Sequence, residues 1–278
     1  QNTNNVILTF TCLVILSALI RLSFLYSASL NAARIGSNLS NLCFESIIRR
    51  PYIHQTSEDS SKVIELISGN IQRTINIIIS CSVVISSTFL SLAIIFALIK
   101  INVLITLVIF TIILASYFLI YKFSRTRLYS NGNKILKSSE KIISLGKETI
   151  YSIRYIIVND LFNVYLKKFE KIDFSLRNNQ AIAKFIGLYP RYLLEAVALI
   201  LLTNVAFFLS KNKPGSDFLP TIGVFSLGFV RLLPAIQQIY RGIANIKTYS
   251  SSLERIVECL EVNQRYRSDI YSTKKTPY

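Results

Sequence analysis

Two long runs of apolar residues near the middle of the chain indicate the class of the protein. Residues 75–99 and 101–121 contain no charged side chain, and only Lys100 separates them. A helix of about 20 residues crosses the ~30 Å hydrocarbon core of a bilayer, whereas a buried strand of a soluble sheet needs only about 4 to 8 apolar residues. The pattern therefore predicts a polytopic, all-α membrane protein and excludes the soluble classes.

Similar apolar segments elsewhere bring the number of predicted membrane spans to five. They cover residues 6–27, 75–99, 101–121, 185–210 and 218–240. The segments after these spans differ in their number of Lys and Arg residues. The two long loops, 28–74 and 122–184, hold five and thirteen and the C-terminal tail holds seven, whereas the two short connections between spans hold one and two. Because cytoplasmic loops carry the excess of Lys and Arg, we place both long loops, 28–74 and 122–184, and the C-terminal tail in the cytoplasm. Gln1 then lies outside, and a chain that starts there without a Met is expected to have lost one preceding span.

Both long loops show the apolar periodicity of amphipathic helices. In the first loop the apolar face ends before Pro51, because the residue before a proline disfavours helical backbone. In the second loop we predict a helix over residues 122–145 that breaks at Gly146. A second amphipathic helix follows it, with an apolar stripe formed by Ile150, Ile153, Ile157, Leu161, Val164 or Tyr165, Phe169 and Ile172. Each loop is thus predicted to run as helix, turn and helix, with the turn far from the membrane.

The composition narrows the possible functions further. The 278 residues carry a net charge of +16, although 51% of them are hydrophobic. We attribute this charge to the excess of Lys and Arg in the cytoplasmic loops, where these cations are attracted to anionic lipid. No nucleic-acid partner is therefore expected. The four cysteines form no C-x-x-C pair and His54 is the only histidine, which argues against a metal site or a redox motif in this chain.

Three segments resemble the transmembrane domain of type I, six-helix ABC exporters. Residues 47–67, with Pro51 and an aromatic residue ahead of a Ser-rich restart, are similar to the first intracellular loop of that family. Residues 147–154 are similar to its second coupling-helix region. Residues 219–256 look like its sixth helix and are most similar to that of bacterial flippases of lipid-linked oligosaccharides. Asn70 departs from the pattern, since an Asp is common at that position.

The resemblance implies a transmembrane domain over residues 1–255 and, over residues 256–278, a linker toward a nucleotide-binding domain that is absent from this chain. No G-x-x-x-x-G-K-[ST] motif and no Gly-Gly pair occur in the sequence, so we expect no catalytic, cofactor or metal site here. ATP and Mg are expected to bind the nucleotide-binding domain, in cis or as a separate subunit. The resemblance also implies a second transmembrane domain, as a homo- or heterodimer, and location in the bacterial inner membrane.

Two sets of candidate site residues follow. The resemblance assigns contacts with the nucleotide-binding domain to the coupling turns, through Pro51, Tyr52, Ser57, Glu58, Glu148, Tyr151 and Arg154. Charges inside apolar runs usually face protein or water, and Arg suits bidentate contacts with phosphate. Arg231, Arg191 and Arg21 are therefore candidates for a cargo cavity. Alternatively, Glu195 pairs with Arg191 on one helix face, and Arg21 extends to the membrane surface.

We therefore expect the membrane-spanning part of an ATP-driven exporter or flippase, which forms the path for a lipid-linked or amphipathic cargo. The complete transporter would be a transport-coupled ATPase. The alternative from another class is an ATP-independent carrier or a membrane scaffold with a different cytosolic partner. The pair of helix-turn-helix loops favours the exporter, because carriers do not need such loops. A peptide or drug exporter of the same family also fits the sequence.

Overall fold

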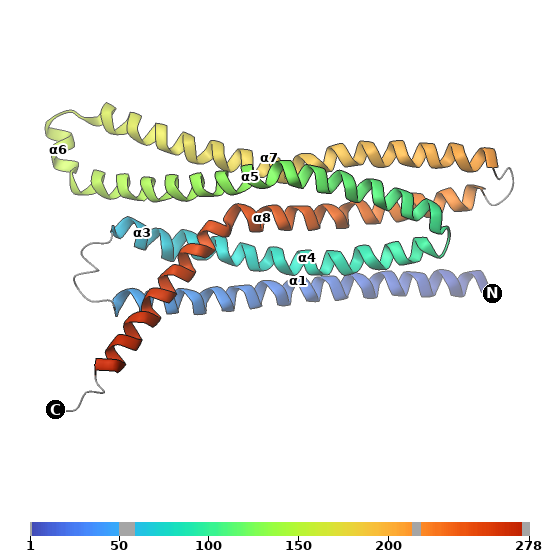
Figure 1. Ribbon diagram of the computed structural model, residues 1–278, viewed down its shortest axis with the longest axis horizontal. Coiled ribbons are helices and arrows are strands. Elements are labelled where there is room, and N and C mark those ends of the chain that lie inside the picture. Colours follow the sequence, from blue (N-terminus) through green and yellow to red (C-terminus); the bar gives the residue numbers. More distant parts are fainter. Residues whose placement is uncertain (1, 50–58, 213–217, 274–278) are drawn as a thin grey trace.

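Helices account for all the regular structure in the described part of the protein. The computed structural model describes residues 2–49, 59–212 and 218–273. The elements, in chain order, are α1 (Asn2–Ile48), α3 (Ser60–Glu65), the π-helical turn η1 (Leu66–Asn70), α4 (Ile71–Ile99), α5 (Val103–Tyr151), α6 (Ile153–Val158), α7 (Phe162–Asn212) and α8 (Phe218–Thr273). Figure 1 shows the long helices running along one axis, with α3 and α6 at one end and the turn between α4 and α5 at the other.

Each predicted span overlaps one of the long helices. Within the described residues, five helical segments are long and apolar enough to cross a membrane. The protein is therefore an all-α, multi-pass membrane protein, as its apolar pattern predicts.

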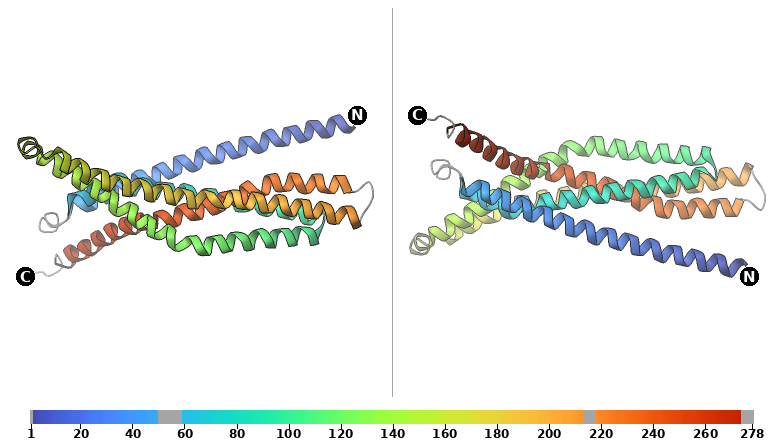
Figure 2. Two further views of the ribbon diagram at one scale, coloured as in Figure 1. Left: turned by 90° about the horizontal axis from the view of Figure 1, so that it is seen from above. Right: turned by 90° about the horizontal axis from the view of Figure 1, so that it is seen from below.

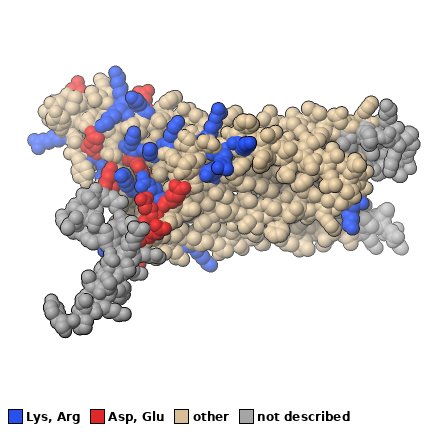
Figure 3. Space-filling view, in the orientation of Figure 1, with Lys and Arg blue, Asp and Glu red and all other residues tan. Residues whose placement is uncertain are grey.

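The helices are much longer than a membrane requires. α5 and α7 contain 49 and 51 residues, which corresponds to roughly 74 and 77 Å at 1.5 Å per residue, against ~30 Å of hydrocarbon. Figure 3 shows that charged side chains gather at the end that carries α3 and α6, whereas the rest of the same face is largely free of them. We conclude that the charged end stands outside the membrane.

The core of the bundle lies between α4, α5, α7 and α8. α4 packs on α8, and α5 packs on α7. One buried apolar cluster extends from Leu98 and Phe225 to Tyr240 and Ala244. α1 joins this group only along its second half and diverges toward the N-terminus (Figure 2), where none of the residues in its most apolar stretch is buried.

Small and polar side chains line the interface between α4 and α8. Ser80 and Ser87 of α4 are buried there, and the Ser87 hydroxyl donates a hydrogen bond to Oε1 of Gln238, at 2.7 Å. A Cβ built on Gly242 of α8 would overlap a valine side chain of α4. Membrane helices without a hydrophobic driving force between them associate through such small residues and interhelical hydrogen bonds.

α5 and α8 cross closely at Gly132, just beyond the apolar core. A Cβ built on Gly132 would overlap the carbonyl oxygen of Thr248, so only a glycine allows the two backbones to meet here. Next to this crossing, the Lys247 ammonium lies 4.8 Å from the centre of the Tyr129 ring, a cation–π contact between the same two helices. The crossing fixes how α5 leaves the bundle on its way to α6.

The helices of the second long loop, residues 122–184, differ from their predicted boundaries. α5 continues through Gly146 to Tyr151, and the chain breaks at Ser152 and again before α7, where Asp160 has a φ of 51°. The predicted break at Gly146 and the continuous amphipathic helix over residues 150–172 are therefore wrong. A glycine inside a helix costs only about 1 kcal/mol relative to Ala, which is too little to end a helix that packs along α7.

We expect Gly132→Ala to destabilise the protein, because the added methyl group forces α5 and α8 apart. Overpacking of this kind costs about 1–3 kcal/mol. The matched control is Gly146→Ala on the same helix, where a Cβ meets no atom within 4 Å and better helix propensity should add up to ~1 kcal/mol. Thermal unfolding of both variants in one detergent measures the difference, and equal melting temperatures would contradict the close crossing.

Candidate functional site

The helix α6 forms the end of the second long loop, residues 122–184, and lies across the ends of α5 and α7 (Figure 1). Its Ile156 side chain is 2% exposed and anchors it to the bundle. The other apolar side chains of this turn point outward, and Tyr151 is 84% exposed. We call this surface the α6 tip and define it by Ile150, Tyr151, Ile153, Tyr155, Ile157 and Val158. An exposed apolar patch outside the membrane indicates a surface that binds another protein.

The Glu148 side chain contacts α7 and so supports the α6 tip through hydrogen bonds within the protein. Its carboxylate accepts hydrogen bonds from the Lys168 ammonium at 3.2 Å and from the Tyr165 hydroxyl at 3.1 Å, both on α7. These bonds, that of Lys168 first, hold the pKa of the Glu148 carboxyl below its ordinary value. The stabilisation from this bridge is therefore present at neutral pH and is lost as the carboxylate is protonated in acid. Arg154, on α6 itself, is exposed.

The first long loop, residues 28–74, meets the second one at the start of α3. Oδ1 of Asp59 accepts a hydrogen bond from the backbone N–H of Ser61 at 2.9 Å, which caps the helix and lowers the pKa of the Asp59 carboxyl. The Lys147 ammonium, near the end of α5, donates to the Ser60 hydroxyl. The predicted contact residues Pro51, Tyr52, Ser57 and Glu58 lie outside the described residues.

A buried ion pair at the base of the first loop is a site that the sequence analysis missed. Nη1 of Arg73 lies 2.6 Å from Oε1 of Glu65, and these side chains are only 14% and 4% exposed. The guanidinium also donates to Oδ1 of Asn70 at 2.9 Å and to the Ser139 hydroxyl of α5 at 3.2 Å. We call Glu65, Asn70, Arg73 and Ser139 the Arg73 network, and it joins the start of α4 to α5.

The π-helical turn η1 lies between the two partners of this ion pair. Glu65 precedes η1 and Arg73 follows it. A Cβ built on Gly69 would overlap the Glu65 carboxylate, so the glycine leaves room for the buried acid. π-Helical turns are frequent at functional sites. The sequence carries no clear signal for this site, because the residues at helical spacing from Glu65 are polar or glycine.

The charged side chains inside the predicted spans are exposed on the single chain. They are Arg21 on α1, Arg191 and Glu195 on α7, and Arg231 on α8. Among the described residues of α7 the ion pairs are those of Lys168 and Arg177, and the alternative pairing of Arg191 with Glu195 is not seen in the single chain. Since charge in contact with hydrocarbon is costly, these surfaces should face protein, water or lipid head groups.

Arg191 lies at the boundary of the membrane on the side of the cytoplasmic loops. The hydroxyls of Ser124 on α5 and Tyr189 on α7 are 3.0 Å apart, so these residues share one depth. Ser124 lies roughly 31 Å along α5 from Val103 at 1.5 Å per residue, which is the full thickness of the hydrocarbon core. Arg191, two residues after Tyr189, is therefore close to the head groups.

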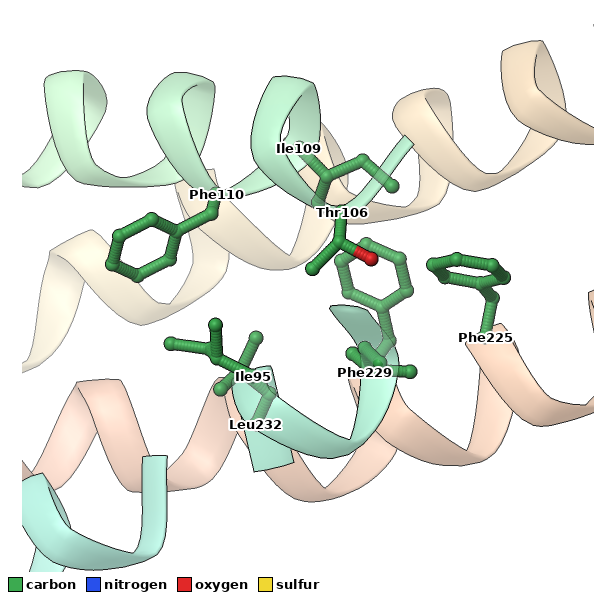
Figure 4. A pocket seen from close by; sticks show the side chains of 8 residues that line it. Ile95, Thr106, Ile109, Phe110, Phe225, Phe229 and Leu232 are labelled. Carbon is green, nitrogen blue, oxygen red and sulfur yellow. The ribbon is translucent and has the colours of Figure 1, made fainter. Parts of the chain in front are cut away.

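Arg231 lies near the opposite surface, beside a small apolar pocket between α4, α5 and α8. Figure 4 shows the lining side chains, which are Ile95, Leu98, Thr106, Ile109, Phe110, Phe225, Phe229 and Leu232. The one polar side chain among them, Thr106, donates its hydroxyl hydrogen bond to the Asn102 carbonyl oxygen at 2.7 Å. The pocket therefore presents no polar group to a ligand. Because Arg231 and Arg191 lie near opposite membrane surfaces, the single chain does not bring the candidate arginines together.

In the described ranges, no three His, Cys, Asp or Glu side chains come close enough together to hold a metal ion. No protein-family model matches the chain.

We expect Arg73→Ala to cost about 3–5 kcal/mol in stability, because it leaves the Glu65 carboxylate buried without a counter-charge. Arg73→Ala combined with Glu65→Gln should recover part of this loss, since no buried charge then remains. The control is Arg177→Ala, which breaks an ion pair with Asp173 whose arginine is 69% exposed and should cost about 0.2–1 kcal/mol. Denaturation of the four proteins measures each effect, and a loss no larger for Arg73→Ala than for Arg177→Ala would contradict a buried role.

Proposed function

We propose that this chain is the membrane-spanning part of an ATP-driven ABC exporter or flippase of a bacterial inner membrane. The observation that carries the proposal is the α6 tip. α5 and α7 extend well beyond the membrane and end in an exposed apolar surface, which a carrier without a cytosolic partner has no use for. Such a surface is suited to a cytosolic domain that pushes or pulls on the long helices.

The partner proposed for the α6 tip is a nucleotide-binding domain, on the same polypeptide or on a separate subunit. That domain binds ATP and Mg, because this chain has no phosphate-binding loop. Tyr151 and Arg154 are available for the contact, since both side chains are exposed. Glu148 takes part indirectly, by holding the ends of α5 and α7 together through Lys168.

Polar contacts outside the membrane support transmission of a movement from the tip to the bundle. Lys147 links the end of α5 to Ser60 of α3, and the Arg73 network links α5 to the start of α4. A displacement of the α6 tip would therefore carry the first loop with it. Rigid-body movement of helix groups between two packings is a common basis for switching, and here it would alternate access to the cargo path.

The proposed cargo is lipid-linked or amphipathic, and the proposed path lies between two such membrane domains. Arg21, Arg191 and Arg231 support this, because a second domain, as a homo- or heterodimer, would place water or protein against charges that otherwise face lipid. Guanidinium groups bind phosphate oxygens in bidentate fashion. The arginines at different depths would then contact a phosphate-bearing cargo at successive stages of its passage.

Cross-linking tests the contact between the tip and the nucleotide-binding domain. Cysteine is introduced at Tyr151 after the exposed Cys12 and Cys81 are changed to serine. We expect a cross-link to the nucleotide-binding domain in membrane vesicles, with a yield that changes when ATP is added. Cysteine at Phe174, also exposed but on the side of α7, is the control and should not react. Equal yields at both positions, or none at Tyr151, would favour a carrier or scaffold.

ATPase measurements on the complete transporter test the cargo path. We expect Arg231→Ala to abolish stimulation by cargo and to leave basal ATP hydrolysis unchanged, because Arg231 lies far from the cytosolic end. Lys134→Ala, an exposed cation of α5 outside the membrane, should leave both activities intact. An equal loss of basal and stimulated activity in Arg231→Ala would indicate a folding defect instead of a cargo contact.

A further inference from the structure

A cluster of polar side chains lies inside the bundle where α5, α7 and α8 meet. Tyr117 of α5 and Tyr240 of α8 have ring centres 5.7 Å apart. The Tyr240 hydroxyl donates to the carbonyl oxygen of Ile186 on α7, at 3.2 Å. Close by, Ser124 of α5 and Tyr189 of α7 are joined by a hydrogen bond. The hydroxyls of Tyr240, Tyr189 and Ser124 therefore each have a hydrogen-bond partner, whereas one hydroxyl of the cluster does not.

The exception is the Tyr117 hydroxyl, which is buried and has no hydrogen-bond partner among the described residues. The residue is 7% exposed. Nε of Arg241 is also buried without a partner among the described residues, and Arg241 directly follows Tyr240, whose ring centre lies 5.7 Å from that of Tyr117. Folded proteins rarely leave buried polar groups unpaired, and a bound water or ion is one way in which such groups are satisfied.

The chain offers no acid that could neutralise Arg241. The sequence contains no Asp or Glu over residues 66–139, 174–194 or 218–253, which include the segments of α4, α5, α7 and α8 that surround it. The charges that these segments carry at this level are cations. Lys122, Arg125 and Lys184 are exposed there and take part in no ion pair within the described structure. These segments therefore offer Arg241 no counter-charge, and an anion from outside them would supply one.

Arg241 lies inside the hydrocarbon core, roughly 8 Å from its surface on the side of the long loops. Its neighbour Gly242 contacts Val84 of α4, which is roughly 22 Å along that helix from Ile99 at 1.5 Å per residue. The hydrocarbon core is ~30 Å thick. The Arg241 side chain is half-buried and long enough to extend from this position to the head groups.

We propose that Arg241 and Tyr117 form a binding site for a phosphate oxygen of an anionic phospholipid in the leaflet next to the cytoplasmic loops. A guanidinium N–H and a phenolic O–H both donate, and a phosphate oxygen accepts, so the ligand completes both orphan groups and supplies the missing negative charge. Basic pockets between membrane helices on the cytoplasmic side bind lipid head groups in this way. The site is independent of any ATPase partner.

The test measures the melting temperature of the purified full chain in nanodiscs of phosphatidylglycerol and of phosphatidylcholine. We expect phosphatidylglycerol to raise the melting temperature of the native protein. Arg241→Gln should abolish this increment and Tyr117→Phe should reduce it, whereas Arg125→Gln, which removes an exposed cation of the same region, should preserve it. Native mass spectrometry of the folded Tyr117→Phe variant, which keeps the ring, should show less bound phosphatidylglycerol than the native protein does.

The other outcomes are distinguishable. An equal loss of the increment in Arg125→Gln would overturn the site, because the effect would then be general surface charge. Two results together would also overturn the site. The first is that Tyr117→Phe raises the melting temperature relative to the native protein by the same amount in both lipids. The second is that Arg241→Gln keeps the increment from phosphatidylglycerol, and water alone would then fill the gap. The same increment from inorganic phosphate in phosphatidylcholine nanodiscs would support a phosphate site and assign soluble phosphate as its source.

Discussion

The length of the helices beyond the membrane is the constraint on which the rest of the structure depends. In lipid, backbone groups find no partner except those of the helix itself, so the spans are stable as helices. Beyond the membrane, water competes for these groups, and a helix is held mainly by the packing of one face. The close crossing of α5 and α8 at Gly132, the Arg73 network and the bridge from Glu148 to Lys168 supply that packing. Together they allow α5 and α7 to present the α6 tip far from the bilayer.

The membrane spans could be predicted because a run of about 20 uncharged residues has few other stable states. The ends of the helices in the second loop could not. Ile150, Ile153 and Ile157 have the same periodicity whether they pack inside the chain or remain exposed for a partner. Gly146 resembles a helix stop, yet contacts with α7 carry the helix past it, and the break falls at Ser152, which shows no comparable signal in the sequence.

The sequence showed which charged residues were candidates for a site, but not which of them pair or how deep in the membrane they lie. Glu65 and Arg73 are eight residues apart, beyond the spacing of three or four that indicates a pair on a regular helix, and the π-helical turn between them is invisible in the sequence. Charges inside apolar runs were recognised correctly. Their depth could not be predicted, because it depends on how far each helix slides along its neighbour: the contact between Ser124 and Tyr189 places Arg191 near the membrane boundary.

The turn η1 sets the rotational phase of α4. A π-helical turn accommodates an additional residue without ending the helix, and one residue corresponds to about 100° of rotation around the helix axis. Upstream of η1 lies the carboxylate that holds Arg73; downstream lie Ser80 and Ser87, which face α8. If one residue were lost from η1, either the ion pair or the serine contacts would turn away from their partners. The first cytoplasmic loop and an interface deep in the membrane therefore share one helical register, and neither can be shifted without the other.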